Sequence, residues 1–130
     1  MNLSYCDDWS LNKKKPWNLI DYNKARLNHI NRIPYSVIAK EDDNIKNVID
    51  IADNNITVYF MNEVVSPYLI YMFRVYDNDR VFLSSAYHTS YDENSNEKLA
   101  HTSFGFQEDG NIYMRLSDIK MGTSTLRHLK

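Results

Sequence analysis

The chain has 130 residues, with 15 Lys and Arg against 17 Asp and Glu and a formal net charge of −2. This length suits a single domain spanning residues 1–130 with a core of its own. Three glycines and a single cysteine, Cys6, exclude a glycine-rich phosphate loop, an intrachain disulfide and a cysteine zinc cage. We therefore expect neither a cofactor nor a bound metal.

From the first residues we expect no targeting signal. They lack the basic segment followed by an apolar run that marks a signal peptide. The longest apolar run, residues 68–73, falls far short of the roughly 18 apolar residues of a membrane-spanning helix. The expectation is a cytoplasmic protein, away from membranes, with Cys6 as a free thiol.

Residues 1–33 are predicted to form a helical N-terminal segment. Apolar residues recur at helical spacing between Trp17 and Ile30, and Pro16 precedes them, as is common in the first turn of a helix. The basic run at residues 13–15 is too short to indicate a nucleic-acid surface, and the chain as a whole is slightly acidic. We expect one or two helices here and no nucleic-acid partner.

Residues 34–118 are predicted to form an antiparallel sheet. Short β-rich segments alternate with turn residues at 35–39, 46–51, 56–62, 68–76, 81–89, 99–107 and 111–117. Residues 44–51 also fit a short helix. Asp109 and Gly110 indicate a two-residue hairpin turn with positive φ at both positions. Residues 119–130 are expected to be a frayed tail.

The predicted fold class is therefore α+β. An antiparallel β-meander of about five or six strands would carry one or two N-terminal helices packed on one face.

The turns also suggest a register, with hairpins centred at residues 78/79, 94/95 and 109/110. In that register Leu69 and Tyr71 share a face, which we expect the N-terminal helix to cover. The opposite face collects tyrosines and arginines, a composition typical of interfaces but also compatible with a second core layer. Its members of interest are Tyr68, Tyr76, Tyr87, Tyr113, Arg74 and Arg115.

Acidic residues follow alternate strands, and alternate turns of a meander lie at the same end of the sheet. Arg80 is the one basic residue beside them in the sequence. Such a cluster would attract a basic partner, although Asp also favours turns for local reasons. The residues concerned are Asp50, Asp53, Asp77, Asp79, Glu108 and Asp109.

The same register sets His88 opposite His101. A cross-strand histidine pair is a candidate for general acid–base chemistry in a small hydrolase or nuclease, or for part of a metal site. The alternative is two histidines that are merely solvated near a strand end. A third possibility is a ligand-binding half-barrel lined by the aromatic face.

Four segments carry a resemblance to a known class of proteins: residues 56–63, 68–73, 81–87 and 104–112, with sequences ITVYFMNE, YLIYMF, VFLSSAY and FGFQEDGNI. They resemble the small immunity proteins that accompany bacterial polymorphic toxins, including those of contact-dependent growth inhibition. The similarity covers about residues 56–117 and consists of strand and turn patterns.

The resemblance implies a non-enzymatic inhibitor that binds a cognate toxin domain, often a nuclease with a basic cleft. An acidic and aromatic surface suits such a partner, because charge speeds association and aromatic contacts slow dissociation. The residues predicted to bind it are Asp53, Asp77, Asp79, Glu108, Asp109, Tyr68, Tyr76, Tyr87 and Arg74. The oligomeric state is left open.

Overall fold

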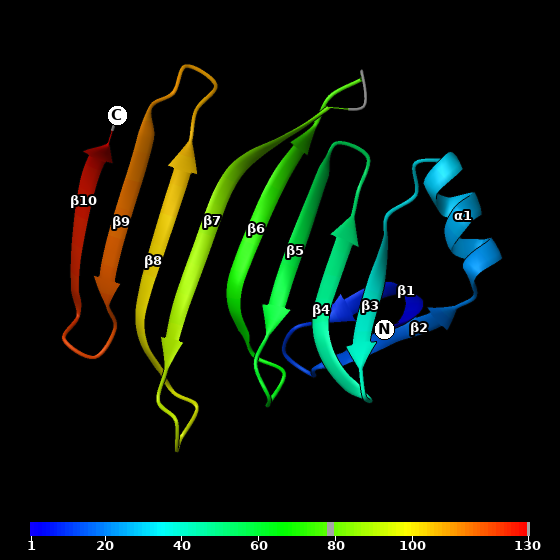
Figure 1. Ribbon diagram of the computed structural model, residues 1–130, viewed down its shortest axis with the longest axis horizontal. Coiled ribbons are helices and arrows are strands. Elements are labelled where there is room, and N and C mark those ends of the chain that lie inside the picture. The colour runs from blue at the N-terminus through cyan, green and yellow to red at the C-terminus, as the bar shows by residue number, and fades with distance from the viewer. Residues whose placement is uncertain (78–79, 130) are drawn as a thin grey trace.

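The structure is a computed structural model that describes residues 1–77 and 80–129. Within these residues the chain forms one antiparallel sheet of ten strands and one α-helix (Figure 1). The spatial order of the strands is β10-β9-β8-β7-β6-β5-β4-β3-β1-β2. The elements are β1 (Asn2–Ser10), β2 (Lys15–Ile20), α1 (Tyr22–Ile30), β3 (Tyr35–Glu41), β4 (Asn44–Ile51), β5 (Asn55–Met61), β6 (Pro67–Val75), β7 (Val81–Tyr91), β8 (Lys98–Phe106), β9 (Ile112–Asp118) and β10 (Thr123–Leu129).

The predicted α+β class is wrong, and so is the prediction of five or six strands with helices on one face. The chain is nearly all antiparallel sheet, and the helix in the described part contains nine residues. No helix within residues 1–77 and 80–129 has the length and apolar character needed to cross a membrane.

Most of the error lies in residues 1–33, where a β-hairpin stands in place of the first part of the predicted helix. The Lys13–Lys15 run lies at the turn of this hairpin, where Lys14 has a φ of 55°. Pro16 is tolerated because β2 is an edge strand that pairs with β1 on one side only. The helix begins after Asp21, whose carboxylate accepts a hydrogen bond from the Lys24 N–H at 2.8 Å.

The part of the sheet from β3 to β10 is a continuous meander. Each strand segment predicted between residues 35 and 117 overlaps one of its strands, and residues 44–51 are the strand β4 rather than a helix. The predicted tail is also a strand, because Gly122, with a φ of 69°, turns the chain so that β10 pairs with β9. The meander ends at β10 as one edge of the sheet (Figure 1).

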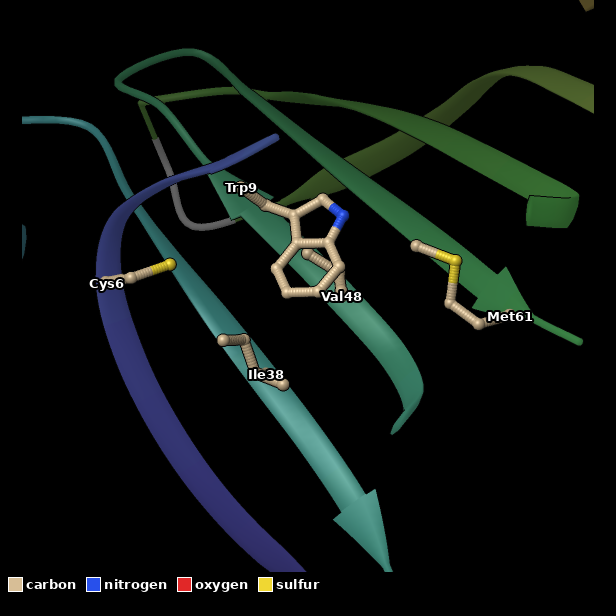
Figure 2. Close-up of a cluster of buried hydrophobic side chains, with 5 residues drawn as sticks. All are labelled: Cys6, Trp9, Ile38, Val48 and Met61. Atoms are coloured by element: carbon tan, nitrogen blue, oxygen red, sulfur yellow. The ribbon is translucent and has the colours of Figure 1, made fainter. Parts of the chain in front are cut away.

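The N-terminal hairpin folds back over the sheet and forms the best-packed core. Residues Asn2–Cys6 of β1 pair with β3, but beyond Cys6 the strand pairs with β2 alone and crosses the sheet. Figure 2 shows the Trp9 ring lying across Val48, with Ile38 and Cys6 on one side and Met61 on the other. These five side chains are at most 5% exposed.

Lys14 ties the hairpin turn to the loop between β5 and β6. Its ammonium donates hydrogen bonds to the Val64 carbonyl at 2.7 Å and to the Ser66 hydroxyl at 3.2 Å. The hairpin is thus held at both its strands and its turn.

The other side of β3 is covered by α1. Ala25 of the helix packs with Tyr35 and Val37 of β3, and Ile49 and Ile51 of β4 contact this cluster. The helix contacts β1 and β3 and lies at that end of the sheet, away from β6–β10 (Figure 1). The prediction that it covers the face of Leu69 and Tyr71 is therefore wrong: it is on the same side of the sheet but several strands away.

Val37 and Ile49 lie on one side of the sheet, and the residues paired with them on each following strand lie on the same side. We define the apolar face as this side over β5–β9. The polar face is the opposite side of β6–β9. The apolar face includes Ile56, Val58, Phe60, Leu69, Tyr71, Phe73, Ala86, His88, Ala100, Thr102, Phe104, Phe106, Ile112, Met114 and Leu116, with Asp118 at the end of β9. The polar face consists of Ile70, Met72, Ser85, Tyr87, Thr89, His101, Ser103, Tyr113, Arg115 and Ser117.

The predicted centre of the β6–β7 hairpin, 78/79, lies outside the described residues; its register matches the pairing of Leu69–Met72, but a bulge between Met72 and Phe73 shifts the rest by one residue. The predicted register is also wrong by one residue on both sides of β8. At the β7–β8 hairpin a bulge at Ser90/Tyr91 moves the pairing, so His88 lies opposite Thr102. At the β8–β9 hairpin the loop has three residues, since the Gln107 carbonyl accepts from the Gly110 N–H at 3.0 Å and Gly110 alone in this loop has positive φ, at 91°. These two shifts cancel for β9, so the faces predicted for β8 are exchanged while those of β9 are not.

The two tryptophans test the role of the hairpin. Replacing Trp9 with Ala removes a buried ring from the core, and we expect a loss of about 3–5 kcal/mol in the free energy of unfolding. The matched control is Trp17→Ala on β2, where the side chain is 60% exposed, and this change should cost less than about 1 kcal/mol. Urea unfolding followed by circular dichroism measures both. Equal losses for the two variants would contradict the packing described above.

Candidate functional site: the turn end of the sheet

Three turns and the C-terminal end of α1 lie at one end of the sheet. They are the β4–β5, β6–β7 and β8–β9 connections, which all lie at the upper end in Figure 1. The turns carry Asp53, Asp77, Glu108 and Asp109, so these four predicted residues do lie at a common end. Asp79, also predicted, lies outside the described residues.

A groove of about 320 Å³ opens at this end between α1 and the sheet. Its apolar floor includes Ile33, Ile51, Ile56 and Val75. The polar residues around it are His29, Arg32, Tyr35, Asp53, Asn54, Tyr76 and Asp77. Three of the predicted residues, Asp53, Asp77 and Tyr76, therefore line one groove.

The helix supplies the basic side of the groove. Arg32, just beyond α1, has its Nε 3.6 Å from the Asp53 carboxylate, and both side chains are more than half exposed. His29 Nδ1 lies 3.1 Å from the Tyr35 hydroxyl. Ile33 reaches the floor because Arg32 adopts a φ of 59° and the Ile33 N–H bonds back to the Asn28 carbonyl at 2.8 Å.

Tyr76 links two of the turns. Its hydroxyl donates a hydrogen bond to the Glu108 carboxylate, and its N–H bonds to the Arg80 carbonyl at 2.9 Å across the β6–β7 hairpin. The bond to Glu108 raises the pKa of Tyr76, while Arg74, also within hydrogen-bond reach, lowers it. Glu108 and Arg74, both predicted to bind a partner, thus stand beside Tyr76.

The Asp109 carboxylate forms its hydrogen bonds within its own turn. Its carboxylate accepts hydrogen bonds from the backbone and side-chain N–H groups of Asn111 at 2.9 and 2.7 Å. These bonds lower the pKa of Asp109. The residue remains exposed and charged, but its geometry is explained by the loop alone.

This end of the sheet is less acidic than the sequence suggests. Arg32, which was not predicted at this end, lies beside Asp53, and Arg74 of β6 is within hydrogen-bond reach of Tyr76. Asp50, expected among the turn residues, lies within β4 instead. The end is therefore a mixed-charge surface with acidic groups at its turns.

Two of the predicted tyrosines lie elsewhere. Tyr68 is at the start of β6, at the opposite end of the sheet from the groove, and is 39% exposed. Tyr87 lies on the polar face, stacked on His101 with ring centroids 5.9 Å apart. Neither contributes to the groove.

The two histidines do not face each other. His88 belongs to the apolar face and His101 to the polar face, because His88 lies opposite Thr102. His101 Nδ1 lies 3.1 Å from the Thr89 hydroxyl, and burial, followed by Lys98, lowers its pKa. Within the described residues no group of three His, Cys, Asp or Glu side chains is placed to hold a metal ion.

Sequence analysis missed a buried polar cluster beneath the N-terminal hairpin. The Ser36 hydroxyl donates to the Asp50 carboxylate at 2.5 Å, and Ser36 is 2% exposed. Burial raises the pKa of Asp50, and it is the main cause that raises the pKa of Tyr59 to about 12 and that of Cys6 to about 11. The sequence feature that could have indicated this cluster is Asp50, a charged residue between Ile49 and Ile51 in an otherwise apolar part of a strand.

This cluster is poorly suited to catalysis at neutral pH. A thiol with a pKa of about 11 stays protonated, and the thiolate is the reactive form. The Cys6 thiol donates to the Asp8 carbonyl at 3.1 Å and is buried. The cluster therefore belongs to the junction between hairpin and sheet.

Comparison of the chain with protein-family models, with curated proteins and with solved structures finds no match.

The buried carboxylate predicts a dependence of stability on pH. The pKa of Asp50 is raised in the folded state. The contribution of Asp50 to the free energy of unfolding is therefore most favourable below its unfolded-state pKa and is lost as pH rises through its folded-state pKa. Asp50→Asn keeps an acceptor for Ser36 without the charge. We expect this variant to gain stability relative to the wild type as pH rises from 3 to 7, measured by urea unfolding.

The control is Asp53→Asn, which removes an exposed carboxylate from the same end of β4. Its effect should stay within about 0.5 kcal/mol at every pH. A neutral-pH loss of stability in Asp50→Asn would show that the ionised carboxylate is favourably held, contrary to this account.

Proposed function

We propose that this protein is a non-enzymatic inhibitor of the immunity type, which binds a cognate toxin domain at the turn end of the sheet. The observation that carries the proposal is the groove at this end, where Asp53, Asp77 and Tyr76 surround an apolar floor. We further propose that it acts in the cytoplasm, where the free thiol of Cys6 would stay reduced.

The groove suits a basic side chain of a partner protein. Lys and Arg combine an apolar stem with a charged head, so the stem can lie on the isoleucine floor while the head meets a carboxylate. The nearby pair of Tyr76 and Glu108 offers a ring and a second carboxylate within the same surface. Nucleases carry such basic side chains around the sites that bind phosphate.

The resemblance to immunity proteins supports the same proposal, since one of the four segments that carry it, residues 104–112, includes Glu108. The competing hydrolase hypothesis relied on a facing pair of histidines. His88 and His101 lie on opposite faces, so that hypothesis has no geometric support here.

The proposal is tested with the protein encoded by the adjacent upstream gene, whose toxin domain is the expected partner. We expect the purified domain to bind this protein and to lose its toxicity on co-expression. Failure to bind or to neutralise that domain would contradict the proposal.

A pair of double variants locates the binding surface. Asp53→Asn with Asp77→Asn removes two charges from the groove and should slow association about tenfold at low ionic strength, with a weaker dependence on salt. The control, Asp42→Asn with Asp43→Asn, removes two charges at the β3–β4 turn, at the opposite end of the sheet, where Asn tolerates the positive φ of both residues. Biolayer interferometry measures both association rates, and equal rates for the two double variants would contradict binding at the groove.

A further inference from the structure

The chain exposes more surface than a folded monomer of its size should. Its accessible area is 9078 Å², against about 7,200 Å² for a compact protein of 15.4 kDa. The excess, roughly 1,900 Å², is about twice the 800 Å² or so that each partner buries in a standard interface. It arises because, in the described part of the chain, the helix and the N-terminal hairpin cover only the β3–β5 end of the sheet.

The apolar face is the part of this surface whose burial would be most favourable, because it is rich in large apolar side chains. It holds four phenylalanines and a tyrosine in two groups. Phe60, Tyr71 and Phe73 form the first group on β5 and β6, and Phe104 and Phe106 form the second on β8, with β7 between the two groups. Its side chains are mostly half-buried, because neighbours in one sheet shield each other sideways but not from above. On β5–β8 none of its residues is Asp, Glu, Lys or Arg, and on β9 the charged residue is Asp118 at the end of the strand, opposite Ala100.

The surroundings of the face match the rim of an interface. Charge returns at its border, where Arg127 of β10 lies opposite Met114. At the other border α1 stands beside the face, over β1 and β3. An uncharged apolar centre with a polar border is the arrangement found in stable protein–protein contacts.

We propose that the apolar face of β5–β9 packs against the same face of a second copy of this chain. Two antiparallel sheets stacked face to face, about 10 Å apart, form a standard sandwich, and this face would then be its interior. A two-fold contact sets each uncharged patch against its equal, so that no like charges meet at the centre. The formal charge of −2 on each chain opposes such pairing only weakly.

The polar face is a poorer candidate for this contact. It carries Arg115 and the stacked pair of Tyr87 and His101, whose polar groups would need new partners in a dry interface. Pairing of two copies through the edge strand β10 would extend the sheet but leave both faces open. Stacking through the apolar face is the arrangement that covers apolar area.

This inference goes beyond toxin binding and does not depend on it. The test uses the full chain alone, by analytical ultracentrifugation from 1 to 100 μM. We expect a mass of twice 15.4 kDa that dissociates on dilution, together with an unfolding midpoint that rises with protein concentration. A monomer throughout this range would overturn the proposal.

Two neighbouring residues of β6 give matched variants. Tyr71 points to the apolar face and Met72 to the polar face, and both are half-buried. Tyr71→Glu should weaken dimerisation at least 30-fold, while Met72→Glu should change it less than threefold. Circular dichroism checks that both variants keep their sheet content.

Dimerisation that survives Tyr71→Glu, or that is lost in Met72→Glu alone, would overturn the proposal, since it would indicate the β10 edge or the polar face. If neither variant folds, a wild type that stays monomeric and whose unfolding midpoint does not change with concentration still overturns the proposal.

Discussion

The Trp9 ring lies across Val48 and beside Ile38 and Met61, and through this contact the N-terminal hairpin rests on β3, β4 and β5. It is the place where two layers of strands enclose a core within the described residues, because beyond Cys6 the strand β1 leaves β3 and crosses the sheet. The sandwich of hairpin and sheet also encloses Asp50 and raises its pKa. The most buried strand of the sheet, β3, lies between this core and α1.

Everything from β6 onward extends outward from that core as a sheet one layer thick in the described part of the chain. Such a sheet keeps its backbone hydrogen bonds but leaves apolar side chains half-exposed on one face, and hydrophobic burial is the main term that stabilises a fold. The apolar face and the groove at the turn end are both consequences of this layout. One presents uncharged apolar area, and the other brings turn residues from distant parts of the chain into one surface.

Local sequence patterns predicted the strands between residues 35 and 117 well, because turn residues and alternation are encoded within each segment. Patterns of this kind did not distinguish a bulge at Ser90/Tyr91 or a three-residue loop ending at Gly110, and each moved the register by one residue. The predicted pairing of His88 with His101 is wrong for that reason. The common location of Asp53, Asp77 and Glu108 survived, because it depends on the order of turns rather than on register.

The N-terminal third was mispredicted because its structure depends on distant contacts. Pro16 and Trp17 suit a helix by local rules, but they belong to an edge strand whose position is set by Trp9 and by the reach of Lys14 to Val64. The groove could not be derived from sequence either, since Arg32 arrives from the end of α1. Residues that act through tertiary contacts leave little trace in local periodicity.

Native-state hydrogen exchange at two protein concentrations tests the central claim, that a two-layer core at β3 and β4 supports a sheet that needs a second copy to be covered. We expect slow exchange in β3 and β4 at both concentrations, and exchange in β6–β8 that is faster at low concentration and slows as concentration rises. Amides of β6–β8 that exchange as slowly as those of β3 and β4 at the lowest concentration would contradict that claim.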